Sequence, residues 1–261
     1  MAAAEVTTTP LPAGTPQNAS TAWPAFWIAC SAVFLVSLDT TMLFAAFDAL
    51  RHSFDGTSAA ELSWVLNGYT VVYAAMLIPA GGLADAHGRR RIFRLGVALF
   101  VLASAACGAA PTVGWLIAAR VLQAIGAALL TPASMAIVLA AFPSERRAVA
   151  VSLWGAVGGL AAAVGPSLGS WVTAQAGWPW AFYINVPIGV WALWRSASRV
   201  EEAVKPSQRR RIDVVGLLLL MVAVGAMALA IVESGSPSWS TQQVGAVAGG
   251  GLLAVLLFVL W

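Results

Sequence analysis

Eight apolar runs divide this chain, and each is long enough to cross a lipid bilayer. About 20 apolar residues in a helix span the hydrocarbon core. Charged residues make up only 10% of the 261 residues, against about 25% in soluble domains. The sequence therefore predicts an all-α polytopic membrane protein, with spans at residues 26–50, 62–84, 92–110, 114–141, 148–174, 181–197, 212–233 and 244–261.

Lysine and arginine are concentrated in alternate loops between these runs. Of the 14 cationic residues, 12 lie in or next to the loops after the second, fourth and sixth runs, whereas the opposite loops carry only Arg51, and Arg120 lies deep inside the fourth run. Because cationic residues in short loops stay on the cytoplasmic side, this distribution predicts a cytoplasmic amino terminus. We expect the protein to lie in the cell membrane, and specifically in the bacterial cytoplasmic membrane.

The spacing of the runs predicts four segments. Residues 1–24 are rich in Ala, Thr and Pro, without Lys or Arg, which predicts a disordered cytoplasmic tail rather than a signal peptide. Residues 25–198 hold six closely spaced spans, and residues 199–211 form a charged cytoplasmic linker. Two further transmembrane helices follow at 212–261. The last run stops at Trp261 without a polar flank, so we expect a piece of a longer protein.

Two charged residues stand out because they lie deep inside the apolar runs. Asp39 is in the middle of the first run, and Arg120 is about two turns into the fourth. The two runs cross in opposite directions, so the side chains are expected at comparable depth and within reach of each other. Charge in the hydrocarbon is costly and marks a functional candidate.

Three roles for these charges stay open. An apolar cavity disfavours an ionised carboxylate whereas a nearby cation favours it, so Asp39 could load and release a proton, with Arg120 tuning it. The two residues could instead form a fixed ion pair that tethers two helices. Asp39 could also contact a cationic substrate.

Uncharged polar residues also fall within the runs. Gln123 lies one turn after Arg120 on the same helix face. Asn67 and Tyr69 in the second run, and Asn185 in the sixth, are weaker candidates. Gln123, Asn67 and Asn185 are possible substrate-cavity residues, and interhelical hydrogen bonding is the alternative for each.

Glycine-rich segments occur at two places. The segment Gly81–Arg91 predicts a short polar loop with a tight glycine turn between the second and third spans. In the fifth run, glycines at spacings of three and four allow close helix packing. Pro166, between Gly165 and Gly169, removes a backbone hydrogen bond. This helix-bending motif predicts either tight packing alone or a bendable seam.

Tryptophans fall near the predicted span ends, where an interfacial belt is expected to anchor the helices. The residues in these positions are Trp23, Trp27, Trp64, Trp115, Trp171, Trp178, Trp180 and Trp239.

The chain lacks the patterns of catalytic and nucleic-acid-binding proteins. Its Ser, His and Asp residues form no nucleophilic set, and no phosphate loop or metal-ligand spacing occurs. We therefore expect no enzyme activity, no catalytic residues, no metal and no cofactor. The cationic residues lie between apolar runs rather than on a soluble face, which argues against nucleic acid as a partner. Cys30 and Cys107 lie inside apolar runs and are expected to be free thiols.

Taken together, these motifs resemble those of the major facilitator superfamily, and within it the fourteen-span drug:proton antiporter group. The similar segments are the glycine-arginine segment 81–91, the first-run acidic segment 38–41, the fourth-run arginine segment 120–128, the fifth-run glycine-proline segment 165–169 and the segment 178–189. The resemblance extends over about residues 25–260.

The resemblance implies roles for these residues. Asp39 would bind the coupling proton and Arg120 would assist its transfer. Five residues of the segment 81–91 would form a conformational latch: Gly81, Asp85, Gly88, Arg89 and Arg90. Ala86 stands where the family has a basic residue, which implies a weaker latch.

The implied architecture is a major-facilitator-type six-helix amino-terminal bundle of 3+3 inverted repeats plus two further helices. A carboxy-terminal bundle would be missing from these residues. The implied function is proton-coupled export of amphiphilic small molecules across a lipid bilayer. Two alternatives stay open: a solute importer or uniporter, and a non-transporting fragment or half-transporter that needs a partner.

Overall fold

A computed structural model describes residues 19–199, 213–235 and 239–261. Within these ranges every regular element is an α-helix, which confirms the predicted fold class. The helices are α1 (Ala19–Ser53), α2 (Ala59–His87), α3 (Arg89–Gly108), α4 (Val113–Ala141), α5 (Ser144–Ala176), α6 (Trp180–Tyr183), α7 (Asn185–Arg199), α8 (Val214–Glu233) and α9 (Thr241–Leu260).

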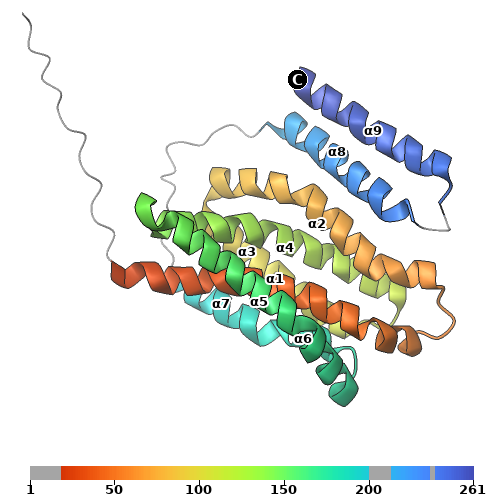
Figure 1. The fold of residues 1–261 in the computed structure, drawn as a ribbon, viewed down its shortest axis with the longest axis horizontal. Helices are drawn as coiled ribbons and strands as arrows, with labels where there is room; N and C mark the ends of the chain where they lie inside the picture. The colour runs from red at the N-terminus through yellow and green to blue at the C-terminus, as the bar shows by residue number, and fades with distance from the viewer. Residues whose placement is uncertain (1–18, 200–212, 236–238) are drawn as a thin grey trace, which may run out of the picture.

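Long helices that follow one another in the chain run in opposite directions. Figure 1 shows α1 to α7 gathered into one bundle, with the α8–α9 pair lying beside α2. A methyl group added at Gly225 of α8 would lie 3.2 Å from the Cβ atom of Ala75 in α2, so these two helices pack closely. Seven of the described helices are long and apolar enough to cross a membrane.

The sixth predicted span differs from the others because its helix is interrupted. It consists of the single turn α6 and the 15-residue helix α7, which meet at Ile184. Pro187 has no backbone N–H and so cannot donate to the Tyr183 carbonyl one turn earlier. Ile184 keeps a right-handed helical conformation (φ −60°, ψ −25°), so the chain direction continues across the interruption.

The predicted polar loop at residues 81–91 is mostly wrong. α2 continues to His87 and α3 begins at Arg89, so Gly88 alone separates them, and Gly81 is helical. The turn is this compact because Gly88 adopts a left-handed φ of +102°, which only glycine reaches without strain. Its N–H bonds to the Ala84 carbonyl at 3.1 Å.

The predicted tail and linker fall partly outside the described residues. α1 begins at Ala19 rather than near residue 25, so residues 19–24 of the predicted disordered tail are helical. Pro24 lies in the second turn of this helix, where it has no N–H to donate to the Ser20 carbonyl one turn earlier. Residues 1–18, and residues 200–212 with most of the charged linker, lie outside the described residues.

Two apolar clusters fill the interior of the bundle, one towards each end. The first contains residues up to Leu35 in α1 and from Ala124 onwards in α4. The second begins at Leu38 in α1 and extends only to Ala119 in α4. Asp39 and Arg120 therefore lie where the two clusters meet, near the middle of the bundle.

Candidate functional site

The two intramembrane charges form a direct ion pair. Asp39 in α1 and Arg120 in α4 are each only 1% exposed, and Arg120 Nη1 donates to Asp39 Oδ2 at 2.6 Å. The structure thus brings together the two residues that the sequence placed at similar depth. A buried charge is stable only when it has a partner and its hydrogen bonds are satisfied. The surrounding polar groups must therefore supply the hydrogen bonds that water would otherwise make to this pair.

Amide side chains from two other positions complete the shell of Asp39. Asp39 Oδ1 accepts from Gln123 Nε2 at 2.8 Å and from Asn185 Nδ2 at 2.7 Å. Gln123 lies in α4, one turn after Arg120, whereas Asn185 is the first residue of α7. The helix interruption at Ile184 therefore lies directly before the residue that reaches Asp39.

Gln123 is the branch point of the network. Its Oε1 accepts from Arg120 Nη1 at 2.6 Å, and its Nε2 donates to Ser104 Oγ of α3 at 2.8 Å as well as to Asp39. The side chains of Gln123 and Ser104 are fully buried. One amide thus joins α1, α3 and α4.

Arg120 is held on its other side by α2. Its Nε donates to the Val65 carbonyl at 3.1 Å, and its Cζ lies 4.0 Å from the centroid of the Tyr69 ring. The Phe182 ring of α6 lies farther away, with its centroid 5.8 Å from Cζ. These contacts stay available to the guanidinium if it leaves the carboxylate.

In this conformation the Asp39 carboxylate accepts three hydrogen bonds, one of them from the Arg120 guanidinium. These donors engage both of its oxygens, Oδ2 from Arg120 and Oδ1 from the two amides. Asn185 Oδ1 is buried without a hydrogen-bond partner, so this amide has an unused acceptor beside the pair.

The other predicted site residues fall in different surroundings. Asn67 is half-buried and lies outside this network, although Val65 and Tyr69 of the same helix belong to it. Gln123 and Asn185 bind Asp39, and a substrate contact of either stays a prediction. Ser104 was missed, and its only signal was a hydroxyl in the middle of the third apolar run.

The predicted latch residues lie at the end of the bundle where α2 meets α3. Arg89 Nη2 lies 3.4 Å from Asp85 Oδ1, a partly exposed pair, and Arg89 Nη1 donates to the Ala136 carbonyl of α4 at 3.2 Å. A cavity of about 700 Å³ lies beside them and is also lined by Gly81 and Arg147. Arg89 therefore ties α3 to the end of α4, and the latch role stays a prediction.

The glycine-proline segment of α5 packs against α1. A methyl group at Gly165 would overlap the Thr41 side chain, and one at Gly169 would lie 2.8 Å from the Met42 carbonyl oxygen. α5 runs without interruption through Pro166. The segment thus gives α5 a close approach to the helix that carries Asp39.

A comparison with known protein families shows which family this chain belongs to. The profile described as Major Facilitator Superfamily matches residues 29–261. The chain belongs to the major facilitator superfamily. Members of this family are membrane transporters rather than enzymes, so the chain is a multi-pass integral membrane protein of a transporter family.

Several named drug and antibiotic resistance proteins of the superfamily are similar in sequence. The chain is 37% identical to the multidrug resistance protein Stp of Mycobacterium tuberculosis, over 81% of this chain and 39% of that protein. It is 37% identical to the methylenomycin A resistance protein of Bacillus subtilis, over 87% and 48% respectively. The cephamycin export protein CmcT of Amycolatopsis lactamdurans is 36% identical, over 94% and 51%. The chain thus spans two fifths to one half of these relatives.

Solved transporters share the fold at low sequence identity. The human organic anion transporter MFSD10 (TETRAN) superposes with a TM-score of 0.58 at 16% identity, over 86% of this chain and 59% of that one. A POT family transporter in complex with a thioalcohol-conjugated peptide gives 0.62 at 14% identity, over 85% and 48%. These similarities concern the fold alone.

Proposed function

We propose that this chain provides the proton-coupling bundle of an exporter of amphiphilic small molecules. The observation that carries the proposal is the buried Asp39–Arg120 ion pair at the middle of the bundle. A carboxylate retained at this depth is costly, and three donors from two other helices, α4 and α7, hold it. The named export and resistance functions of the similar proteins supply the direction of transport and the class of substrate.

In the proposed cycle, proton binding and the Arg120 contact exclude each other. When Asp39 is ionised, Arg120 bonds to it, as in the present conformation. When Asp39 takes up a proton from the outer side, its attraction for the guanidinium weakens. Arg120 then keeps its bonds to Gln123 and to the Val65 carbonyl. Proton loss to the cytoplasm restores the pair and resets the bundle. Alternating access in this family is a rocking of one bundle against another, so the cycle belongs to the whole protein.

The first test is the substitution Asp39→Asn in the native product that contains these residues. Everted membrane vesicles from an efflux-deficient bacterium are given an inward-acid pH gradient, and uptake of ethidium and a panel of amphiphilic antibiotics is measured. We expect gradient-driven uptake to fall to the background of empty vesicles, because an amide cannot carry the proton. Exchange of labelled substrate without a gradient should persist.

Asp48→Asn is the matched control. Asp48 lies in the same helix, but its side chain is 77% exposed, and its one ion pair among the described residues is with His52 at 3.6 Å, so transport should be unchanged. Asp39→Asn also leaves Arg120 without its counter-charge, and breaking a buried pair costs about 3–5 kcal/mol. Size-exclusion chromatography of both variants therefore accompanies the assay. Full gradient-driven uptake by folded Asp39→Asn protein would overturn the proton role, and uptake only in right-side-out vesicles would indicate an importer.

A further inference from the structure

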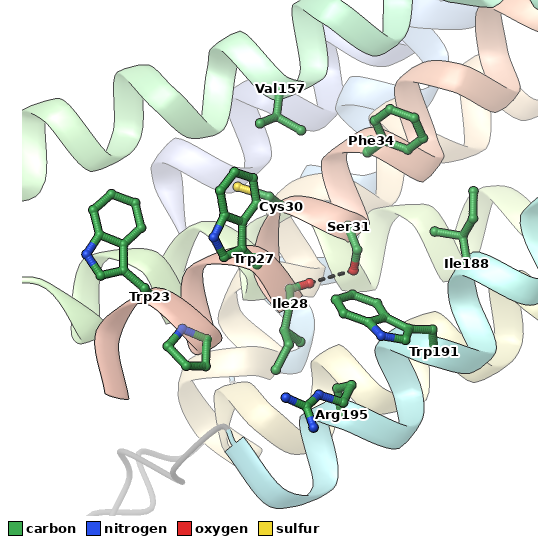
Figure 2. A pocket seen from close by; sticks show the side chains of 11 residues that line it. Trp23, Trp27, Ile28, Cys30, Ser31, Phe34, Val157, Ile188, Trp191 and Arg195 are labelled. Atoms are coloured by element: carbon green, nitrogen blue, oxygen red, sulfur yellow. Dashed lines mark hydrogen bonds between the residues drawn. The ribbon is translucent and has the colours of Figure 1, made fainter. Parts of the chain in front are cut away.

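A groove between α1, α5 and α7 lies apart from the ion-pair network. It encloses a cavity of about 720 Å³, and most of its lining is aromatic or aliphatic. Figure 2 shows Trp23, Trp27 and Phe34 of α1 along one side, with Ile188 and Trp191 of α7 opposite them. None of these five residues contacts Asp39 or Arg120 through the network described above, so the groove is a separate site.

One charged residue lies at the end of this groove. Arg195 of α7 belongs to its lining and is half-buried. In Figure 2 its guanidinium turns from α7 towards the start of α1. The described ion pairs involve Asp39, Asp48 and Asp85, none of which lines the groove. Within the described part of the chain, the groove thus combines one cation with an apolar channel and no carboxylate.

The groove matches one leaflet of a bilayer in depth. Trp23 and Phe34 are 11 positions apart in α1, which corresponds to about 16 Å along a helix. One leaflet contributes about 15 Å of hydrocarbon. Trp23 and Trp27 are 46% and 55% exposed, so nothing in the described part of the chain covers this side of α1. Tryptophan at the headgroup level is the usual marker of the interface.

We propose that this groove binds one anionic phospholipid from the leaflet on the arginine-rich side of the bundle. The phosphate bonds to Arg195, and an acyl chain lies along Trp27 and Ile188 towards Phe34. Charge complementarity selects the lipid class, because a zwitterionic headgroup brings its own cation close to the guanidinium. The expected preference for an anionic over a zwitterionic lipid is about fivefold, the effect of one arginine near an anionic headgroup.

The test counts bound lipids on the native protein. Protein purified with an equimolar mixture of phosphatidylglycerol and phosphatidylcholine is analysed by native mass spectrometry, and the retained lipids are compared. The parent protein should retain phosphatidylglycerol with about fivefold preference. Arg195→Gln should abolish the preference, whereas Arg195→Lys should keep most of it. Soluble glycerophosphoglycerol should not compete, because the acyl chain fills the groove.

Arg146→Gln is the matched control, since Arg146 is an exposed arginine at the same end of the bundle outside the groove lining. This variant should retain the lipid preference. An unchanged preference in Arg195→Gln overturns the proposal, and so does an equal loss in Arg146→Gln, which would show a general surface charge effect. Val157→Trp, which fills the groove with Arg195 intact, should lower lipid retention. Full retention in that variant would overturn the placement of the acyl chain.

Discussion

At the scale of single residues, Gln123 bonds to three other side chains of the buried network. It accepts from Arg120 and donates to Asp39 and Ser104, and its side chain is fully buried. Gln123→Leu should therefore destabilise the protein by about 1–3 kcal/mol for each buried group left unsatisfied. The measurement is the thermal unfolding midpoint of purified protein in detergent, which should fall by several degrees.

Gln242→Leu is the control for this change, because Gln242 is exposed in the first turn of α9. Its midpoint should match that of the parent protein. If the two variants unfold at the same temperature, the hydrogen bonds of Gln123 contribute no net stability and the network is weaker than its geometry indicates.

The sequence predicted the centre of the site better than its surroundings. Charged residues in apolar runs are rare enough that Asp39 and Arg120 stand out, and opposite helix directions place them at one depth. The structure puts them in contact. Ser104 gave no comparable signal, because a serine in a membrane helix usually satisfies its hydroxyl within its own helix. The link from Asn185 to Asp39 depends on how α7 packs, which local sequence does not encode.

At the scale of helices, apolar length predicted the spans and missed their interruptions. Seven predicted spans match described helices that are long and apolar enough to cross a membrane. The break at Ile184 depends on a single absent hydrogen bond, and the one-residue turn at Gly88 depends on one backbone angle. Both features leave the apolar pattern unchanged, so a pattern-based prediction could not locate them.

Close packing of α5 on α1 gives a prediction at this scale. A methyl group at Gly169 would lie 2.8 Å from the Met42 carbonyl oxygen and 2.9 Å from its Cα, so Gly169→Ala must push the two backbones apart. Overpacking of this kind costs about 1–3 kcal/mol, against about 1 kcal/mol gained from helix propensity. We expect a lower thermal unfolding midpoint in detergent. Gly159→Ala in the same helix meets nothing within 4 Å and should be neutral or stabilising, so equal midpoints for the two variants would contradict the close approach.

At the scale of the whole molecule, the exposed surface is apolar in the way a bilayer requires. The α8–α9 pair shows this most clearly, with Leu218 and Val222 of α8 and Leu253 and Val259 of α9 all exposed. The pair contacts the bundle through α2, as the Gly225–Ala75 approach indicates. These outer faces are expected to meet lipid or further parts of the protein, because large exposed apolar surfaces mark such contacts.

The orientation of the molecule in the membrane gives the last prediction. Figure 1 shows the ends of α2 and α4 and the starts of α3 and α5 on one side of the bundle. This side carries Arg89 and Arg147, so it should face the cytoplasm.

Ser144→Cys on this side should react with a membrane-impermeant maleimide only after cells are permeabilised. Ser53→Cys at the opposite side should react in intact cells. Both serines are exposed, whereas the native Cys30 and Cys107 are free and buried, so the parent protein supplies a low background. Labelling of Ser144→Cys alone in intact cells would reverse the orientation, and with it the assignment of the proton-uptake side to the outer face.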